Sequence, residues 1–146
     1  MKTISFTIKI NAPINKVWNT LWNDETYREW TKHFIPGSFY ESDWELGGKT
    51  LFLSPERDGM YATITKLEKP SVVIFNHLGE IVNGVESQQY EKGAFEKYQL
   101  NEADGITTLT ISVDIVDEYE QNMNEGFTKG LEEVKRIAEN NRQSNN

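Results

Sequence analysis

Two histidines carry the most versatile chemistry in this sequence. His77 falls near the end of residues 72–78, a strongly β-forming segment, and strand alternation places it on the same face as Phe75. Histidine titrates near neutral pH, so a histidine that faces a cavity can anchor a polar group or act as a general base. A hydrogen-bonded or surface histidine is the alternative, and the sequence leaves both interpretations open. His33 lies in a short helical region, where we expect it at the surface.

The sequence offers no support for metal, thiol or nucleotide chemistry. The chain of 146 residues contains no cysteine, which excludes disulfides, thiolate metal ligands and a cysteine nucleophile. The two histidines have no metal-ligand spacing, and no G-x-S-x-G, P-loop, H-E-x-x-H, EF-hand or dinucleotide-binding motif occurs. We therefore expect no cofactor and no metal, and we assign no catalytic residue.

The excess of acidic residues narrows the classes of partner. There are 23 Asp and Glu residues against 15 Lys and Arg, a net charge of −8, and no basic cluster. A negative potential disfavours nucleic acid and anionic membranes as partners. No apolar run approaches the roughly 20 residues that span a bilayer, and the N-terminus has no signal-peptide core. We expect a soluble, cytoplasmic protein.

Hydrophobic periodicity predicts a strand, two short helices, a run of strands and a final helix. Residues 4–10 alternate with a period of two, as in a strand. A short helix is predicted before Asp24, and a second begins at Asp24, its expected N-cap, and ends at Pro36-Gly37. Further strands are predicted over residues 38–46, 49–53, 60–67, 72–78 and 95–100, and from Asp104-Gly105 to Ile115. The glycine-bearing stretch 79–93 is expected to be a long loop.

One apolar stripe marks the final helix, from about Glu118. Its members are Tyr119, Met123, Phe127, Leu131, Val134 and Ala138. Such a helix must bury its stripe, and the apolar face of the sheet is the site available. Gly126 and Gly130 lie one turn apart within it, although each costs about 1 kcal/mol relative to alanine. They predict a close approach to the backbone, by a ligand or by a crowded strand.

Several short motifs resemble the START-like, or SRPBCC, superfamily. Residues 10–18 (Ile-Asn-Ala-Pro-Ile-Asn-Lys-Val-Trp) are similar to its opening strand, Ala-Pro step and Val-Trp pair. Trp30 stands where such proteins often carry a Trp, and residues 44–49 (Trp-Glu-Leu-Gly-Gly-Lys) are similar to its Gly-Gly hairpin. The likeness looks closest to the branch named after the activator of the heat-shock-protein ATPase.

The resemblance implies a fold and a cavity. The fold is the α+β helix-grip: a curved antiparallel β-sheet, two short helices after the first strand, and a long C-terminal helix across the concave face. In relatives, the cavity between sheet and helix holds lipids, sterols, polyketides or other hydrophobic molecules, and a few use it for cyclisation or aromatisation. We expect a single domain over residues 1–140 and a polar tail over 141–146.

The leading hypothesis is therefore binding of a small hydrophobic or aromatic ligand. Aromatic residues make up 12% of the chain, more than packing requires, and a buried Tyr or Trp also needs a polar partner. The candidate ligand-binding residues are Trp30, Phe34, Phe52, Tyr61, Phe75, His77, Tyr98, Met123 and Phe127. Two alternatives stay open: a cyclase- or aromatase-like enzyme with His77 as acid–base group, and a regulatory module that binds a chaperone or another partner. The oligomeric state is also open, a homodimer included.

Overall fold

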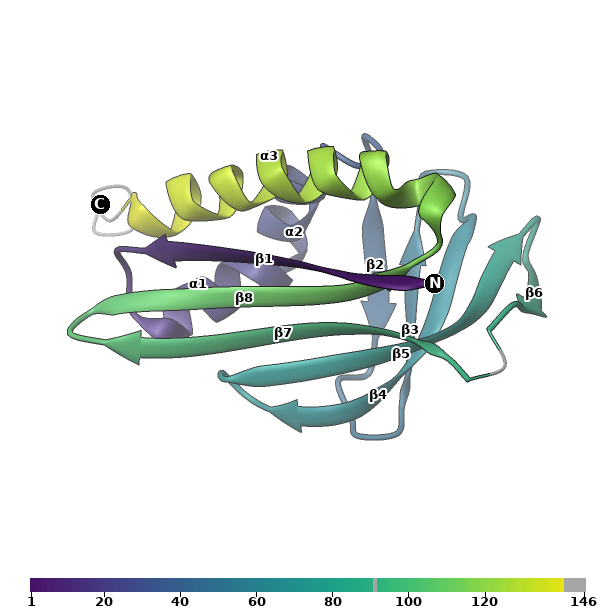
Figure 1. Cartoon of the computed structure of the whole chain (residues 1–146), viewed down its shortest axis with the longest axis horizontal. Coiled ribbons are helices and arrows are strands. Elements are labelled where there is room, and N and C mark those ends of the chain that lie inside the picture. Colours follow the sequence, from purple (N-terminus) through teal and green to yellow (C-terminus); the bar gives the residue numbers. More distant parts are fainter. Residues whose placement is uncertain (91, 141–146) are drawn as a thin grey trace.

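The computed structural model describes residues 1–90 and 92–140, in which one curved antiparallel sheet wraps a long helix (Figure 1). The strands are β1 (Lys2–Ile10), β2 (Phe39–Ser42), β3 (Lys49–Leu53), β4 (Gly59–Glu68), β5 (Val72–Val82), β6 (Val85–Gln88), β7 (Ala94–Ala103) and β8 (Ile106–Ile115). Their order is β1-β8-β7-β5-β4-β3-β2, with β6 paired to the far part of β5. The predicted helix-grip fold is confirmed.

The two long strands at one edge of the sheet bury the face that their alternation predicts. Phe6 pairs with Ile111, and Ile8 pairs with Leu109. Leu109 and Ile111 are completely buried, whereas the polar residues that alternate with them on β8 are half-buried. These include Thr110, Ser112 and Asp114. The inner face of β1 and β8 is therefore continuous apolar surface on which helices can pack.

The short helices α1 (Ile14–Trp22) and α2 (Asp24–Thr31) follow β1 as predicted. Pro13 precedes α1 in extended conformation, consistent with its role as a helix start signal. The N-cap of α2 is Asn23 rather than the expected Asp24, which is the first helical residue. Trp22 lies at the centre of the core that these helices close. Its ring packs against those of Trp18, Tyr27, Tyr40, Trp44, Phe75 and Tyr98.

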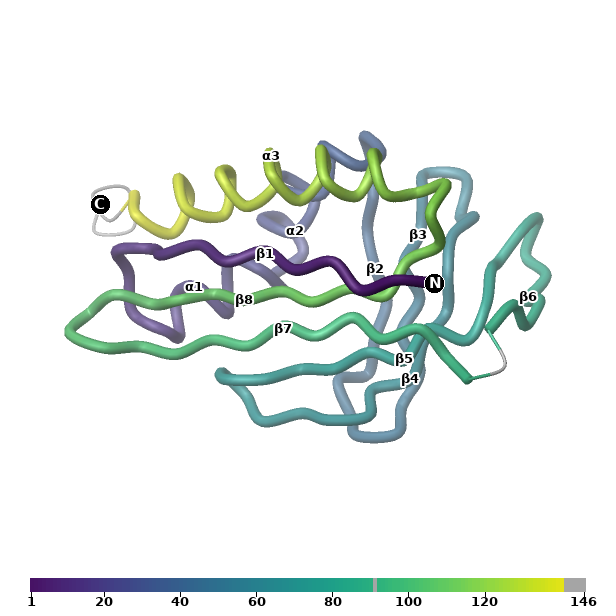
Figure 2. The backbone as a smooth tube through the Cα atoms, in the orientation of Figure 1, coloured from purple at the N-terminus to yellow at the C-terminus, as the bar shows by residue number. Residues whose placement is uncertain are grey.

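The last helix, α3 (Glu120–Glu139), follows a short 3₁₀ turn (Asp117–Tyr119) and contacts α1, α2 and β1. Figure 2 shows its backbone running alongside β1. A Cβ atom on Gly126 would lie 2.4 Å from the Phe34 ring, and one on Gly130 would lie 2.9 Å from the Trp30 carbonyl oxygen. The close approach predicted from these glycines exists, but α2 and the segment after it make it, instead of a ligand or a strand.

The sheet differs from prediction in the segment 79–93, which is not a long loop. β5 continues to Val82 and turns into β6 through Asn83 and Gly84, whose φ angles are +54° and +78°. Asn-Gly is the preferred pair for a two-residue hairpin turn with both φ angles positive, and the sequence carried this signal. β2 is also shorter than predicted and ends at Ser42. The predicted polar tail, 141–146, lies outside the described residues.

Candidate ligand-binding site

Two cavities lie between the inner face of the sheet, α2 and the first turns of α3. The first, which we name the α2 cavity, has a volume of about 210 Å³ and is lined by α2, β3, β4, β5, β7 and α3. The second, the β8 cavity, has a volume of about 300 Å³ and extends to β8 and to the segment before α3. The cavities adjoin, because they share the lining residues Phe34, Ile35, Gly59, Met60, His77, Glu96 and Met123.

A chain of three polar side chains lies on the wall of the α2 cavity. His77 Nε2 lies 2.8 Å from Glu96 Oε1, and the Tyr98 hydroxyl donates a hydrogen bond to the other carboxylate oxygen. His77 comes from β5, and the other two come from β7, its neighbour in the sheet. Glu96 pairs in register with Phe75, so its carboxylate can reach along the inner face to His77.

Burial raises the pKa values of two tyrosines at this site, Tyr98 and Tyr27. Burial raises the pKa of the Tyr98 hydroxyl well above its usual value of 10.0, and the charge of Glu96 raises it further. The same two causes, in the same order, raise the pKa of Tyr27, which also lines the α2 cavity. Both phenols are therefore neutral hydrogen-bond donors at physiological pH.

Of the polar atoms of His77, Glu96 and Tyr98, His77 Nδ1 is buried without a hydrogen-bond partner among the described residues. His77 is 6% exposed, and its Nδ1 is buried without a hydrogen bond. In the neutral tautomer whose Nε2–H donates to Glu96, Nδ1 carries a lone pair and can accept a hydrogen bond. Buried polar atoms are nearly always satisfied, so this nitrogen is a natural contact for a guest molecule.

Seven of the nine predicted site residues line the α2 cavity. They are Trp30, Phe34, Phe52, His77, Tyr98, Met123 and Phe127. Trp30 is fixed by a hydrogen bond of 3.0 Å from its Nε1 to the Leu21 carbonyl oxygen. The ring centroid of Phe127 lies 4.9 Å from that of Phe34 and 6.5 Å from that of Trp30. These contacts join α2 to α3 at the cavity wall.

Tyr61 and Phe75 line neither of the two cavities. Phe75 is fully buried, and its ring centroid lies 5.1 Å from that of Phe52. It therefore packs against a residue that lines the α2 cavity without lining the cavity itself. Tyr61 belongs to a separate apolar cluster with Leu53 and Ile81, where Lys49 Nζ lies 5.4 Å from its ring centroid. On β4, Tyr61 lies between Met60, which lines both cavities, and Ala62, which belongs to the main core, so alternation turns its side chain to the other face of the strand.

Acidic residues of the lining, among them Glu96 and Glu80, escaped the sequence-based prediction. Glu96 shares its strand face with Tyr98, and that alternation was the available signal. Glu80 became visible only in the structure. His77 of β5 pairs with Ala62 of β4, and Gly79 of β5 pairs with Tyr61, the residue before Ala62. The β5 residue between His77 and Gly79 is therefore bulged out of the ladder. The bulge changes the alternation, and both His77 and Glu80 line the β8 cavity.

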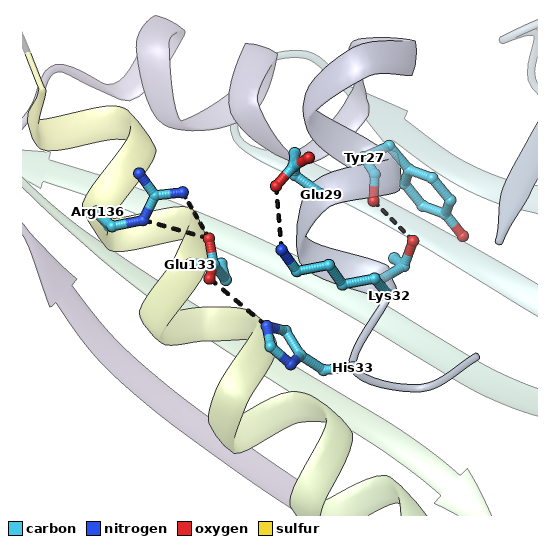
Figure 3. Close-up of polar contacts among 7 residues, drawn as sticks. Tyr27, Glu29, Lys32, His33, Glu133 and Arg136 are labelled. Atoms are coloured by element: carbon cyan, nitrogen blue, oxygen red, sulfur yellow. Dashed lines mark hydrogen bonds and ion pairs between the residues drawn. The ribbon is translucent and has the colours of Figure 1, made fainter. Parts of the chain in front are cut away.

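A polar contact also joins α3 to the segment just after α2, between Glu133 and His33 (Figure 3). Glu133 on α3 receives a hydrogen bond of 2.7 Å from Arg136, and its Oε1 lies 3.6 Å from Nε2 of His33. The hydrogen bond from Arg136 lowers the pKa of Glu133. His33, expected at the surface, has a side chain that is 24% exposed and faces α3. It lies outside both cavities and supports the helix pair that forms part of their wall.

Within the described part of the chain, no three His, Asp or Glu residues are grouped so as to hold a metal ion. No helix of residues 1–90 and 92–140 is long and apolar enough to cross a membrane.

The chain matches a family model over residues 11–139. The family is described as "Activator of Hsp90 ATPase homolog 1-like protein". No curated protein sequence matches the chain.

Solved structures with the same fold come from several bacteria. The Aha1 dimer from Colwellia psychrerythraea is 19% identical, with a TM-score of 0.72 over 96% of this chain and 98% of that one. Protein CV1439 from Chromobacterium violaceum is 15% identical, with a TM-score of 0.70 over 95% and 99%. CalU16 from Micromonospora echinospora is 13% identical, with a TM-score of 0.66 over 97% and 79%. At these identities the likeness establishes the fold.

Proposed function

Because the chain belongs to the START-like superfamily, in the family of activator of Hsp90 ATPase homolog 1-like proteins, we propose that its adjoining cavities bind one small hydrophobic or aromatic molecule. The observation that carries the proposal is the pair of cavities itself, of about 210 and 300 Å³, beside a buried polar chain. Protein interiors are close-packed, and voids larger than a water molecule are few. Space of this size beside the core supports a role in binding.

The wall chemistry suits a mostly apolar guest. Phe52, Met123 and Phe127 supply apolar surface, and each Å² of apolar surface removed from water contributes about 25 cal/mol. His77 and Tyr98 add a small number of polar atoms at one side. A mainly apolar cavity with a few convergent polar groups is the usual form of a small-molecule site.

Titration with the neutral dye Nile red tests the proposal. We expect saturable binding with enhanced fluorescence, because the dye leaves water for an apolar cavity. Met123→Trp places a larger side chain where both cavities are lined and should weaken binding by about tenfold or more. Val85→Trp is the matched control, since Val85 is 65% exposed on β6 and lines neither cavity. Binding that is absent, or that both variants leave unchanged, would contradict the proposal.

An acid–base enzyme is the second candidate, and the contact between His77 and Glu96 favours it. A carboxylate that orients an imidazole is a common arrangement for a general base. His77→Ala separates the candidates once a bound molecule is known. A binding protein keeps most of its affinity, whereas an enzyme of this kind loses about 10²–10⁴-fold in rate.

The similarity to the Aha1 dimer favours a homodimer over other protein partners. The hairpin of β5 and β6 offers Val82 and Val85, which pair with each other and are 53% and 65% exposed. Analytical ultracentrifugation of the chain over a range of concentrations tests this. A homodimer through the hairpin should dissociate in Val82→Lys, and a monomer at every concentration excludes it.

A further inference from the structure

The β8 cavity is lined by negative charge without a counter-charge. Its lining contains Glu80, Glu96 and Asp114 and, among the described residues, no Lys or Arg. Asp114 accepts hydrogen bonds from the Thr3 hydroxyl (2.5 Å) and the Phe95 backbone N–H (3.1 Å). Thr3 is exposed and pairs with Asp114 across the sheet, so this carboxylate lies on the outer face, and Glu80 and Glu96 are the acidic residues that can reach a guest.

Aromatic rings accompany these carboxylates. Phe34, Tyr90 and Tyr119 line the same cavity. Burial raises the pKa of the Tyr90 hydroxyl, and the charge of Glu80 raises it further, so the two side chains interact electrostatically. The face of an aromatic ring attracts cations, and rings combined with carboxylates are the usual surroundings of an ammonium group in proteins.

His77 supplies an independent indication of a ligand at this site. It lines the β8 cavity and is 6% exposed, and its Nδ1 has no partner. In the neutral tautomer whose Nε2–H donates to Glu96 at 2.8 Å, the unpaired nitrogen can accept a hydrogen bond from a guest. An ammonium or amine N–H is such a donor, whereas a carboxylate or phosphate oxygen is not.

We propose that the ligand is an amphiphilic amine, with its cationic group in the β8 cavity and its apolar part in the α2 cavity. This inference rests on the proposed function and deepens it. Glu80 faces the ammonium charge, aromatic rings line the same cavity, and His77 Nδ1 accepts one of its hydrogens. A fatty acid or another anionic ligand would bring its charge close to Glu80 and Glu96, with no Lys or Arg among the described lining residues to offset it.

The shared partition explains how one guest can occupy both cavities. Met60 and Met123 line both of them, and methionine is unbranched with three rotatable bonds. Changes of rotamer at these two positions can widen the passage at small cost. An elongated molecule can then place each end in the cavity whose chemistry suits it.

A matched series of three compounds tests the proposal by displacement of Nile red. Each carries a naphthyl group on a two-carbon chain that ends in an ammonium, a hydroxyl or a carboxylate group. We expect the ammonium compound to bind about tenfold more tightly than the alcohol, and the carboxylate to bind most weakly. The titrations are run at about 0.15 M salt, where the Debye length is about 8 Å, so that the overall negative charge contributes little.

Two charge-removing variants locate the effect. Glu80→Gln keeps the shape of the β8 cavity and removes one charge, so it should weaken the ammonium compound by about tenfold and the alcohol by less than about twofold. Glu132→Gln removes an equal charge from an exposed position on α3 and should change neither.

The possible results separate this inference from the proposed function. A carboxylate compound that binds as tightly as the ammonium compound overturns the inference, and so does equal weakening of all three compounds by Glu80→Gln. Nile red that binds but is displaced by none of the three also overturns it and leaves the proposed function standing. If Nile red and all three compounds fail to bind, the proposed function fails as well.

Discussion

His77 Nε2 lies 2.8 Å from Oε1 of Glu96, a residue of the neighbouring strand, and this contact organises the polar side of the site. The second oxygen of Glu96 accepts a hydrogen bond from Tyr98. One carboxylate thus joins β5 and β7 and fixes the orientation of the imidazole. Buried hydrogen-bond networks of this kind stabilise a single arrangement only when every member is present. Each member is therefore open to a mutational test.

The first prediction concerns the Tyr98 hydroxyl. Tyr98→Phe removes one donor to Glu96 and leaves a ring of nearly the same size in a site that is 2% exposed. We expect the free energy of unfolding at neutral pH to fall by about 1–3 kcal/mol, because the Glu96 carboxylate loses a hydrogen-bond donor. Urea denaturation measures this. No measurable loss would show that the hydroxyl is not essential to the network.

The second prediction is a loss of stability at alkaline pH. The pKa of Tyr98 is raised well above 10.0 in the folded protein, whereas the unfolded chain titrates near that value. Below pH 10.0 both states hold the proton, so the contribution of Tyr98 to stability is constant. Above it the unfolded state loses the proton first, and the free energy of unfolding therefore decreases as pH rises.

Urea denaturation between pH 9 and about 11.5 checks this prediction. The decrease should be shallower in Tyr98→Phe, which lacks the titrating group. Tyr27→Phe should also be shallower, because the pKa of Tyr27 is raised for the same main reason, burial. Tyr61→Phe is the control. Equal slopes in all four proteins would mean that the buried phenols do not determine the alkaline limit.

The architecture was predictable because several independent patterns agreed. Alternation identified β1 and β8, and the stripe through Phe127 and Leu131 identified α3. A helix with one apolar face has few places to be buried, so the fold class followed. The hairpin at Asn83-Gly84 was missed although its turn signal was present, because the polar flanking residues of β6 are exposed on both faces and show no alternation.

The aromatic part of the site was predictable to a similar extent, and its polar part was not. Periodicity predicts which side chains of one strand share a face, and it placed His77 on the face of Phe75 without deciding whether that face points inward. It does not predict which residues of different strands meet, so the contact between His77 and Glu96 required the register of β5 with β7. The inward position of Glu80 depends on a bulge, a local break in the alternation on which such predictions rely.

The third prediction separates the roles of the two glycines of α3. At Gly130 an added Cβ would lie 2.9 Å from a backbone oxygen of Trp30, which cannot move without shifting α2. Gly130→Ala should therefore destabilise the protein by about 1–3 kcal/mol, despite the better helix propensity of alanine. At Gly126 the obstacle is the ring of Phe34, a side chain that can move into the cavity it lines. Gly126→Ala should cost less stability and should weaken Nile red binding.

Thermal unfolding and Nile red titration of both variants provide the test, with Asn124→Ala, at an exposed position of α3, as the control. If Gly126→Ala binds the dye as tightly as the unmodified protein, Phe34 has moved away from the cavity. If Gly130→Ala is as stable as the control, the contact between α2 and α3 is looser than the structure indicates.

The fourth prediction compares two buried tryptophans of the helical layer. Trp30 Nε1 donates to the Leu21 carbonyl oxygen at 3.0 Å, whereas Trp22 Nε1 has no partner. Replacement by phenylalanine removes ring area in both cases, but only Trp30→Phe also removes a hydrogen bond, one that joins α1 to α2. We expect Trp30→Phe to lower the free energy of unfolding by about 1–2 kcal/mol more than Trp22→Phe.

Urea denaturation of the two variants under identical conditions measures the difference. Nile red binding gives a second and independent readout, because Trp30 lines the α2 cavity and Trp22 does not line either one. Trp30→Phe should therefore change dye affinity as well as stability, while Trp22→Phe should change stability alone. A larger loss of stability in Trp22→Phe would mean that the ring packing around Trp22 outweighs the hydrogen bond between the helices, and that the cavity wall depends more on the core beneath it than on the junction of α1 with α2.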